Sequence, residues 1–328
     1  MLTLSTRLTI LPPRHGPSLL RRSLALASKQ ASGGPSSVCS KLTLIGGGKM
    51  AEAILNALHT KKIQRLQDIM VVDPNGERLA YLREKFIGVK TATSFDKIKG
   101  SDIVVLAVKP QHVDQVANGL ADDSLGGALV LSIVAGCTIQ TLKDKFRTDF
   151  VIRSMPNTPA SILEGITVWT ATPQSPADSV DKARLMLAAM GEQISVSDES
   201  YLDMATAVSG SGPAYVFLVI EALIDAAVHI GFPREIATKL VIHTVRGSAS
   251  YAEHAGVPVS DLRNNVTSPG GTTASALFSL ERGGFRTVLS EGVWSAYRKA
   301  LELGGKNSNV GPDRNMFNPV AGKGASRV

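Results

Sequence analysis

Short apolar runs alternate with helix-like segments from Lys41 to about Val196, and this alternation constrains the fold more than any other feature of the sequence. The runs are KLTLIG at 41–46, DIMVVD at 68–73, DIVVLAV at 102–108, ALVLSIVAG at 128–136, DFVIRS at 149–154 and GITVWTA at 165–171. Strands that are apolar on both faces are typical of a parallel sheet covered by helices. The sequence therefore predicts an α/β domain with a Rossmann-like, doubly wound parallel sheet.

After about Ser197 the strand pattern stops, and helical periods separated by Gly and Pro predict an all-helical second domain. The helix expected over 213–230 is apolar nearly all round, so it must be buried in its domain or against another chain. We expect a homodimer through it. Its two acidic residues argue against a membrane span. The expected helices are Glu199–Val208, Pro213–Ile230, Pro233–His254, Thr272–Arg282 and Phe285–Leu303.

The positive charge of the chain lies mainly at its two ends. The net charge is +7, of which residues 1–40 carry +5 without any acidic residue, and the tail from Lys306 carries +3. The remaining segment, 41–305, has a net charge of −1, which argues against a nucleic-acid groove. From the strand, helix and charge patterns together, we divide the chain into a leader (1–40), a dinucleotide-binding domain (41–198), a helical domain (199–305) and a tail (306–328). The tail is rich in Gly, Asn and Pro, so we expect it to be disordered.

The leader has the composition of an organelle transit peptide, because it is basic, rich in Ser and Thr and free of acidic residues. This composition predicts a mitochondrial or other organellar location. A disordered extension in a cytoplasmic protein is the alternative. Cys39 lies in this leader and Cys137 in the body, so we expect no internal disulfide after cleavage.

The segment KLTLIGGGKMAEAILNAL reads as a strand, a glycine turn and a helix. Gly46, Gly48 and Ala51 occupy the three positions of the dinucleotide fingerprint. Glycine lets the backbone approach a pyrophosphate, which the amides and dipole of the following helix stabilise. The segment 45–50 (Ile45, Gly46, Gly47, Gly48, Lys49 and Met50) therefore predicts a nicotinamide-dinucleotide site.

Asp73 closes the second expected strand, where the fingerprint places an acid for the ribose 2′-hydroxyl. A carboxylate there would repel a 2′-phosphate and favours NADH over NADPH. Two alternatives stay open. Asp73 could simply cap the turn DPNG, and the nearby Arg78 could offset the repulsion.

Several loops follow expected strands and face the same edge of the sheet. AVKPQ contributes Lys109, IVAG at 133–136 contributes small residues, and RSMPNTPA at 153–160 contributes an amide and hydroxyls. In the helical domain, SPGGTT at 268–273 exposes successive amides just before a helix, which builds an uncharged anion site suited to a small carboxylate. An ordinary capped helix start is the alternative reading of SPGGTT.

The sequence shows no nucleophile set, no metal-ligand spacing and no Walker-type phosphate loop, so we predict no metal site. Hydride chemistry must then come from the cofactor.

Together these motifs resemble pyrroline-5-carboxylate reductases. The resemblance rests on IGGGKMAEAI, AVKPQ, RSMPNTPA, AVSGSGPAYVF at 207–217 and DLRNNVTSPGGTTASALFSLE at 261–281, in unbroken order over about Lys41 to Gly305. SGSGPAY followed by SPGGTT is the specific part, since many dehydrogenases share the glycine fingerprint. The resemblance implies reduction of L-1-pyrroline-5-carboxylate to L-proline with NADPH or NADH, the last step of proline biosynthesis.

The resemblance also implies site residues and an assembly. Members of the family form dimers through the helical domain and often larger homo-oligomers. The cofactor would be lined by residues 45–50, Asp73, Ser94, Ala107, Val108, Lys109, Pro110, Ala135 and Asn265. The substrate would be surrounded by Glu199, Ser268, Gly271, Thr272 and Thr273, and Thr273, the expected catalytic residue, would orient the ring nitrogen while water donates the proton.

Two positions depart from the family pattern and leave the cofactor preference open. Ser94 stands where many members have Asn, and Asp73 stands where a small hydroxyl residue is common. The rival functions are a hydroxyacid dehydrogenase, for which the helices offer only Lys239 and Lys299 as acid or base, and a redox sensor that binds NAD(P)H without turnover.

Overall fold

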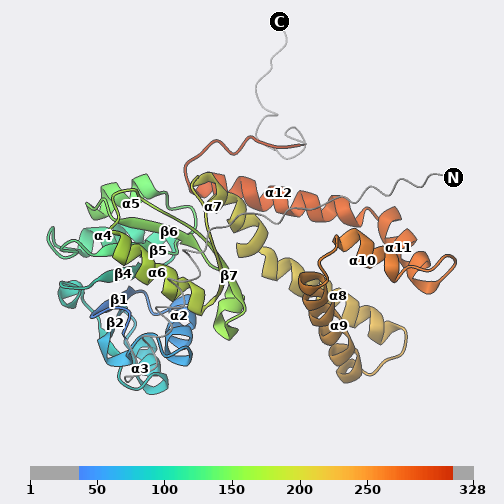
Figure 1. Ribbon diagram of the computed structural model, residues 1–328, viewed down its shortest axis with the longest axis horizontal. Coiled ribbons are helices and arrows are strands. Elements are labelled where there is room, and N and C mark those ends of the chain that lie inside the picture. Colours follow the sequence, from blue (N-terminus) through green and yellow to red (C-terminus); the bar gives the residue numbers. More distant parts are fainter. Residues whose placement is uncertain (1–36, 313–328) are drawn as a thin grey trace, which may run out of the picture.

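The computed structural model describes residues 37–312, and Figure 1 shows a sheet domain on one side and a group of long helices on the other. Residues 1–36, which hold nearly all of the expected leader, and 313–328, which hold most of the expected tail, lie outside the described residues.

The first domain is built on one eight-stranded sheet with the order β3-β2-β1-β4-β5-β6-β7-β8. β1, β2 and β4 to β7 are the expected strands, and of these β1, β2 and β4 to β6 pair in parallel. Their burial on both faces explains the continuous apolar runs. The strands are β1 (Leu42–Ile45), β2 (Ile69–Val72), β3 (Lys90–Ala92), β4 (Ile103–Leu106), β5 (Leu129–Ser132), β6 (Val151–Met155), β7 (Gly165–Ala171) and β8 (Gly191–Ser195).

One strand pair departs from the predicted parallel sheet. β6 and β7 are antiparallel, with Ile152 opposite Ala171 and Met155 opposite Val168. They are joined by a short segment that contains only the 3₁₀ helix η5 (Thr158–Ile162). A parallel pair needs a crossover of about a dozen or more residues, usually with an α-helix, so this short connection enforces the reversal.

The edge strands β3 and β8 were not among the expected strands. Their sequences, KTA and GEQIS, are short and largely polar. They lie at the two edges of the sheet, where fewer side chains are covered, so they lack the apolar run that marks a buried strand.

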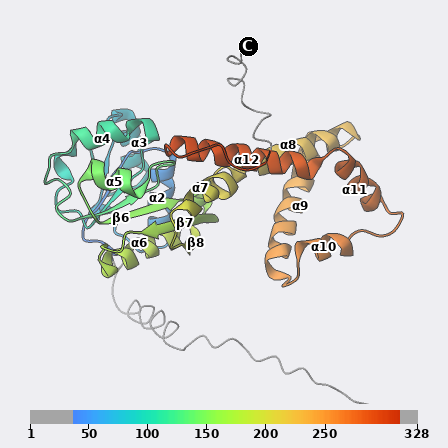
Figure 2. The ribbon, with the colours of Figure 1, turned by 90° about the horizontal axis from the view of Figure 1, so that it is seen from above.

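Helices pack on both faces of this sheet, as Figure 2 shows from above. Buried apolar side chains form one cluster on each face. The helical elements are α2 (Lys49–Thr60), η2 (Leu66–Asp68), α3 (Gly76–Lys85), η3 (Phe95–Lys97), η4 (Pro110–His112), α4 (Val113–Gly119), α5 (Ile139–Phe146) and α6 (Ala177–Ala189).

The last residues of the expected leader pack against the domain. The Cys39 amide donates to Gln64 Oε1 at 2.8 Å, and Gln64 Nε2 donates back to the Cys39 carbonyl at 2.9 Å. Cys39 is 1% exposed, and its thiol and that of Cys137 are both free and buried. The folded domain therefore includes residues 37–40 as well as those from Lys41.

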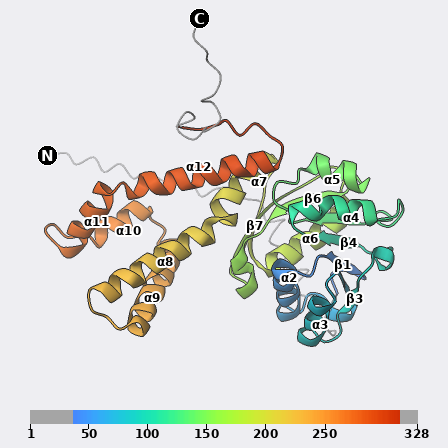
Figure 3. The same cartoon turned by 180° about the vertical axis from the view of Figure 1, so that it is seen from behind.

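The second domain is all-helical in the described chain, and its distal helices extend away from the sheet (Figures 1 and 3). The starts and ends expected for Thr272–Arg282 and Phe285–Leu303 are those observed. The elements are α7 (Ser200–Ala205), the π-helical segment η6 (Thr206–Gly210), α8 (Gly212–His229), α9 (Arg234–His254), α10 (Val259–Asn265), α11 (Thr272–Arg282) and α12 (Phe285–Leu303).

The motif SGSG marks a close approach between the domains rather than an end of the helix. The chain passes from α7 through η6 into α8. A Cβ atom on Gly210 would lie 2.5 Å from Met155 Cε at the end of β6, so only glycine fits without a shift. Because η6 also contacts α12, this segment joins the sheet domain to the helical domain.

α8 is apolar, yet none of its residues is buried within the described chain. Val216, Phe217 and Leu218 are 47%, 62% and 66% exposed. The continuous helical stretch Ser200–His229 is long and apolar enough to cross a membrane by length and composition alone, with 6% of its most apolar window buried. An apolar helix in water must be covered, by another chain or by lipid.

Candidate functional site

The glycine turn between β1 and α2 forms a cradle for a phosphate group. Gly46 has φ +98°, and a Cβ there would lie 2.6 Å from the Ala107 carbonyl oxygen, so the turn requires glycine at this position. A Cβ on Gly48 would meet no atom within 4 Å. Gly48 is the N-cap of α2 and has no side-chain cap. The first amides of the helix therefore face open space, which fits the pyrophosphate of a dinucleotide.

A cleft of about 380 Å³ opens beside this turn at the carboxyl ends of β1, β2 and β4. Seven predicted cofactor residues line it: Ile45, Gly46, Gly48, Asp73, Ala107, Val108 and Lys109. It is the crevice in which ligands of open α/β sheets bind, and it has room for part of a dinucleotide.

The structure adds lining residues that the sequence reasoning missed. Thr93 and Phe95 follow the edge strand β3, while His112, Gln115 and Val116 come from η4 and α4 after AVKPQ. Each of these residues follows a strand at the same edge of the sheet, and this position is the signal that could have identified it. Thr93 and Phe95 were missed because KTA is too short and polar to be predicted as a strand. His112 was missed because it comes just after the predicted loop AVKPQ.

Other predicted cofactor residues lie next to the cleft without lining it. Ser94 stands between Thr93 and Phe95, and its hydroxyl donates to Asp96 Oδ2 at 3.0 Å. Pro110 begins η4 directly after Lys109. Ala135 lies in the loop after β5, and Gly47 donates its amide to Asp73.

Asp73 is held by the backbone on both carboxylate oxygens. Oδ2 accepts from the Gly47 amide at 2.7 Å, and Oδ1 accepts from the Asn75 amide at 2.8 Å. The second bond is the turn-capping contact of DPNG, and the first fixes the carboxylate against the glycine turn. Asp73 can therefore cap the turn DPNG and, at the same time, line the cofactor cleft.

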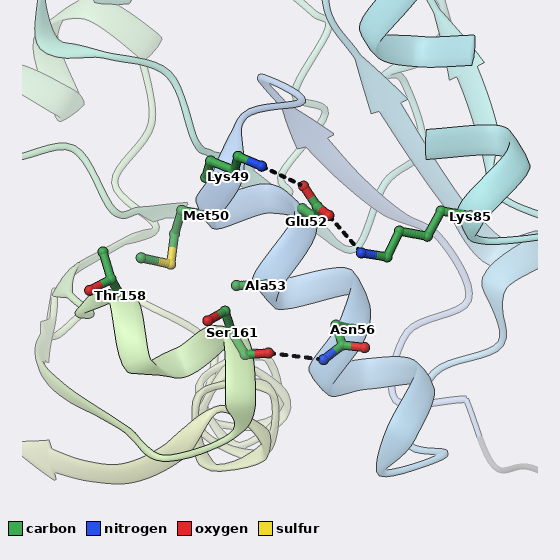
Figure 4. Close-up of a pocket in the computed structure, with 8 residues that line it drawn as sticks. All are labelled: Lys49, Met50, Glu52, Ala53, Asn56, Lys85, Thr158 and Ser161. Carbon is green, nitrogen blue, oxygen red and sulfur yellow. Dashed lines mark hydrogen bonds and ion pairs between the residues drawn. The ribbon is translucent and has the colours of Figure 1, made fainter. Parts of the chain in front are cut away.

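A second pocket, of about 430 Å³, lies between α2 and η5 (Figure 4). Lys49 and Met50, which were expected at the cofactor, line this pocket instead of the first one. Glu52 lies at its wall, flanked by Lys49 and Lys85. Burial would raise the pKa of Glu52, but hydrogen bonds from Lys85, Arg78 and Tyr81 outweigh burial and lower the pKa to about 2. Glu52 is thus an anion at neutral pH.

SPGGTT forms the open N-terminus of α11, as expected. Gly270 has φ +69°, which favours glycine, and Gly271 is the N-cap without a side-chain cap. Ser268 and Thr272 are exposed, and Thr273 is half-buried. The first amides of this helix of 11 residues are thus oriented toward an anion position.

One chain does not bring SPGGTT to the glycine turn. α10 and α11 lie at the far end of the helical domain from β1 and α2 in every view (Figures 1 and 3). Asn265, at the end of α10, lies there as well. The predicted substrate and cofactor residues thus form two separate groups within one copy of the chain.

Glu199, the remaining predicted substrate residue, belongs to a buried ionic cluster between the domains. Arg153 on β6 donates to Glu199 Oε1 at 2.7 Å and to Asp203 Oδ1 at 2.6 Å, and Lys306 donates to Asp203 Oδ2 at 2.6 Å. Glu199 Oε1 also accepts from the Ile139 amide at 2.8 Å. Arg153 and Asp203 are 2% and 1% exposed. The cluster fixes Glu199 at the start of α7, and it shows that the expected tail begins with a structural contact at Lys306.

The two helix-borne lysines of the rival dehydrogenase reading make ordinary surface ion pairs. Lys239 pairs with Glu235 and Lys299 with Glu302, each at least 60% exposed. Neither lies in a pocket described above. Among residues 37–312, no group of three or more His, Cys, Asp or Glu side chains is placed to hold a metal ion.

Comparisons with known proteins cover both domains. The sequence model described as pyrroline-5-carboxylate reductase dimerisation matches residues 199–303, and that of NADP oxidoreductase, coenzyme F420-dependent, matches residues 41–136. The pyrroline-5-carboxylate reductase of Synechocystis is 41% identical over 269 residues, which cover 81% of this chain and 99% of that protein.

Solved structures agree in fold over the same range. The pyrroline carboxylate reductase of Plasmodium falciparum, solved with NADP bound, has a TM-score of 0.74 and 30% identity, and the match covers 83% of this chain and 100% of that one. The enzyme of Coxiella burnetii has a TM-score of 0.73 and 36% identity over 80% of this chain and 98% of that one. The expected resemblance is thus confirmed along most of the sequence.

Proposed function

This chain belongs to the pyrroline-5-carboxylate reductase family, and from that premise we propose that it reduces L-1-pyrroline-5-carboxylate to L-proline with NADH or NADPH. The observation that carries the proposal is the presence of two helix N-termini that begin at a glycine and have no side-chain cap. One follows a dinucleotide glycine turn, and the other begins at Thr272 within SPGGTT. The substrate has a carboxylate for the second and an imine carbon that can accept hydride.

The residues present fit a nicotinamide dinucleotide. Gly48 and the first amides of α2 would hold the pyrophosphate, and the cleft along Asp73 and Lys109 would hold the adenosine half. The reduced nicotinamide, when bound, supplies the hydride. Binding and orientation of the substrate then fall on the protein.

The substrate loop orients and polarises the substrate. The Gly271 amide donates to the Ser268 carbonyl at 3.0 Å and closes the turn, so the amides at Thr272 and Thr273, the first of α11, would bind the carboxylate without placing a cation beside the ring nitrogen. The Thr273 hydroxyl would hydrogen-bond that nitrogen. A protonated imine accepts hydride more readily than a neutral one, and a hydroxyl is too weak an acid to protonate it. We assign the proton to bulk water, with which the imine exchanges protons before the hydride transfer, so that the protonated form is the one that reacts. Positioning then supplies much of the rate.

We propose that a complete site is shared between two copies of the chain in a homodimer. The distance between SPGGTT and the glycine turn within one chain supports this proposal (Figures 1 and 3), as does the exposed apolar surface of α8. Two copies that cover α8 against each other would also bring the helical domain of one toward the sheet domain of the other. The match of residues 199–303 to a dimerisation model supports the homodimer on which this arrangement depends.

The activity test is the oxidation of NADH, and separately of NADPH, followed at 340 nm with L-pyrroline-5-carboxylate as substrate. Turnover that is lost in Gly48→Val, but retained in a variant of an exposed pair such as Lys239→Met, supports the reductase. Tight cofactor binding without turnover by the wild type would favour the redox-sensor reading.

Mixed dimers test the shared site. Gly48→Val inactivates the cofactor half, and Thr273→Val combined with Gly271→Val inactivates the substrate half. If each site uses both copies, random exchange of the two inactive proteins gives hybrids with one intact site of two. We expect about a quarter of wild-type activity to return, by counting the dimers formed. No recovery after demonstrated exchange would refute the shared site.

We propose a mitochondrial or other organellar location for the protein, with cytoplasmic location as the alternative. The support is the acid-free, basic composition of residues 1–40. Because Ser37 to Ser40 pack against the domain, a cleavage that leaves the fold intact would fall before Ser37. Imaging of the full chain fused at its C-terminus to a fluorescent protein, with and without residues 1–36, tests the address.

A further inference from the structure

Arg78 lies beside the same glycine as Asp73, since a Cβ on Gly47 would be 3.4 Å from Asp73 Oδ2 and 3.5 Å from Arg78 Cγ. It is the arginine that a 2′-phosphate of NADPH could recruit there, and in this structure its guanidinium is already bound. Nε donates to the Gly47 carbonyl, while Nη2 donates to the Gly48 carbonyl at 3.3 Å and to Glu52 Oε2 at 2.6 Å. The guanidinium also stacks on Tyr81, 4.8 Å from the ring centroid. The Arg78 side chain is 21% exposed, so it lies against the protein rather than reaching into solvent.

Glu52 is the anchor of this arrangement. Its Oε1 accepts from Lys85 Nζ at 2.7 Å and from the Tyr81 hydroxyl at 2.9 Å, and its Oε2 accepts from Arg78. The Glu52 side chain, on α2, is 13% exposed, and Figure 4 shows it between Lys49 and Lys85. Glu52 on α2 therefore binds three side chains of α3 through its two carboxylate oxygens. Moving Arg78 away would be unfavourable, because the partly buried carboxylate of Glu52 would lose its hydrogen bond from the guanidinium.

Among the described residues, Asp73 is the one acidic residue in the lining of the cleft, and Lys109, after the end of β4, is the one lysine or arginine in it. Asp73 lines the cleft, and the Gly47 and Asn75 amides fix its carboxylate. In dinucleotide-binding folds an acid at this place binds the ribose 2′-hydroxyl, while a nearby arginine accommodates a 2′-phosphate. Here the acid is in position, and the arginine is bound to Glu52, which Lys49 and Lys85 also contact.

We propose that Glu52 is a specificity-determining residue, which selects NADH by holding Arg78 away from the 2′-phosphate position beside Asp73. This proposal rests on the proposed function only in taking the ligand to be a nicotinamide dinucleotide. Two carboxylates then discriminate NADH from NADPH. Asp73 repels the 2′-phosphate, and Glu52 binds the arginine that would otherwise pair with that phosphate.

Equilibrium binding tests this proposal without turnover. Fluorescence titration of NADH and NADPH gives one affinity ratio, and calorimetry of AMP and adenosine 2′,5′-bisphosphate gives a second, since that pair differs only in the 2′-phosphate. We expect the wild type to bind NADH about tenfold or more tightly than NADPH, as a hydrogen bond to a charged group is worth roughly that factor. Equal or tighter binding of NADPH by the wild type would overturn the proposal.

The variants separate the two carboxylates. Glu52→Ala should tighten NADPH binding about tenfold with little change for NADH, because it frees Arg78 for a charge-assisted bond. The double variant Glu52→Ala with Arg78→Met should lose that gain. The matched control Lys85→Met removes another cation from Glu52 but leaves Arg78 bound, so it should give no gain. A gain that persists without Arg78, or equal changes for both cofactors, contradicts the proposal.

A further variant guards against misfolding of Glu52→Ala. Arg78→Met alone should leave the ratio of NADH to NADPH affinity unchanged, because the guanidinium is not available to the phosphate in the wild type. A selective loss of NADPH affinity in Arg78→Met would refute the idea. The two proposals can fail separately. If the affinity ratios of the variants are as expected but the protein does not reduce L-pyrroline-5-carboxylate, the proposed function is wrong and the selection of NADH by Glu52 is supported.

Discussion

Replacing Arg153 by Met should destabilise the protein more than any other single loss of an ion pair described above. The side chain is 2% exposed and binds Glu199 and Asp203 at 2.7 and 2.6 Å. Its removal leaves Asp203, 1% exposed, with Lys306 as its remaining cation. Removing one partner of a buried pair costs about 3–5 kcal/mol in free energy of unfolding, because the other charge stays buried.

This magnitude translates into a measurable loss of melting temperature. At about 2–4 °C per kcal/mol for a chain of this size, Tm should fall by about 6–20 °C. Circular dichroism at 222 nm, scanned with temperature, measures the change. The charge cluster joins β6 to α7 and to the segment after α12, so the loss should also weaken the attachment of the helical domain.

Two matched variants test the reasoning. Arg147→Met removes an exposed cation, which pairs with Asp122 across a surface where the side chains are 67% and 84% exposed, and it should cost at most about 1 kcal/mol. Lys306→Met, with a side chain 34% exposed, should fall between the two. A Tm for Arg153→Met within 2 °C of the Arg147→Met value would show that burial does not control the strength of these pairs.

The remaining predictions concern the cofactor turn, acid stability and the thiols. Gly48→Val should abolish cofactor binding in calorimetry with little change in Tm, whereas Gly46→Ala should lower Tm as well, because its Cβ would lie 2.6 Å from a backbone oxygen at φ +98°. Glu52, whose pKa is lowered from 4.5 to about 2, should contribute about 3 kcal/mol of stability above pH 4.5 and lose it as the pH falls toward 2. Denaturant titrations of wild type and Glu52→Gln should therefore converge at low pH, and a gap that is independent of pH would contradict the assignment. Burial raises the pKa of Cys39 to about 12 and raises that of Cys137, so neither thiol should react with iodoacetamide at pH 8 until the protein unfolds, and rapid labelling of the native protein would show that the thiols are accessible.

Much of the fold could be predicted because its signals are local. The run IVVL at 103–106 is apolar at every position and forms the buried strand β4. The helix Thr272–Arg282 begins after SPGG and ends before a Gly-Gly pair, so its predicted and observed bounds agree. The glycine turn was equally readable, since Gly46 and Gly48 meet a requirement of backbone geometry that depends on few neighbours.

Other features depend on partners that are remote in the sequence. Arg153 finds its carboxylates 46 and 50 residues later, and Asp203 finds Lys306 a further 103 residues on. No period or spacing in the sequence announces such contacts. The reversal of β7 follows from a connection too short for a crossover, and the edge strands β3 and β8 take their conformation from the strand beside each of them.

The sequence by itself determined the two-domain plan, the dinucleotide turn and the family, because apolar periodicity and glycine positions encode local backbone geometry. Tertiary structure alone decided that SPGGTT and the glycine turn lie apart in one chain, and that Glu52 binds Arg78 26 residues away. Distances between elements follow from the packing of the whole molecule, and charges pair according to those distances rather than to their order along the chain.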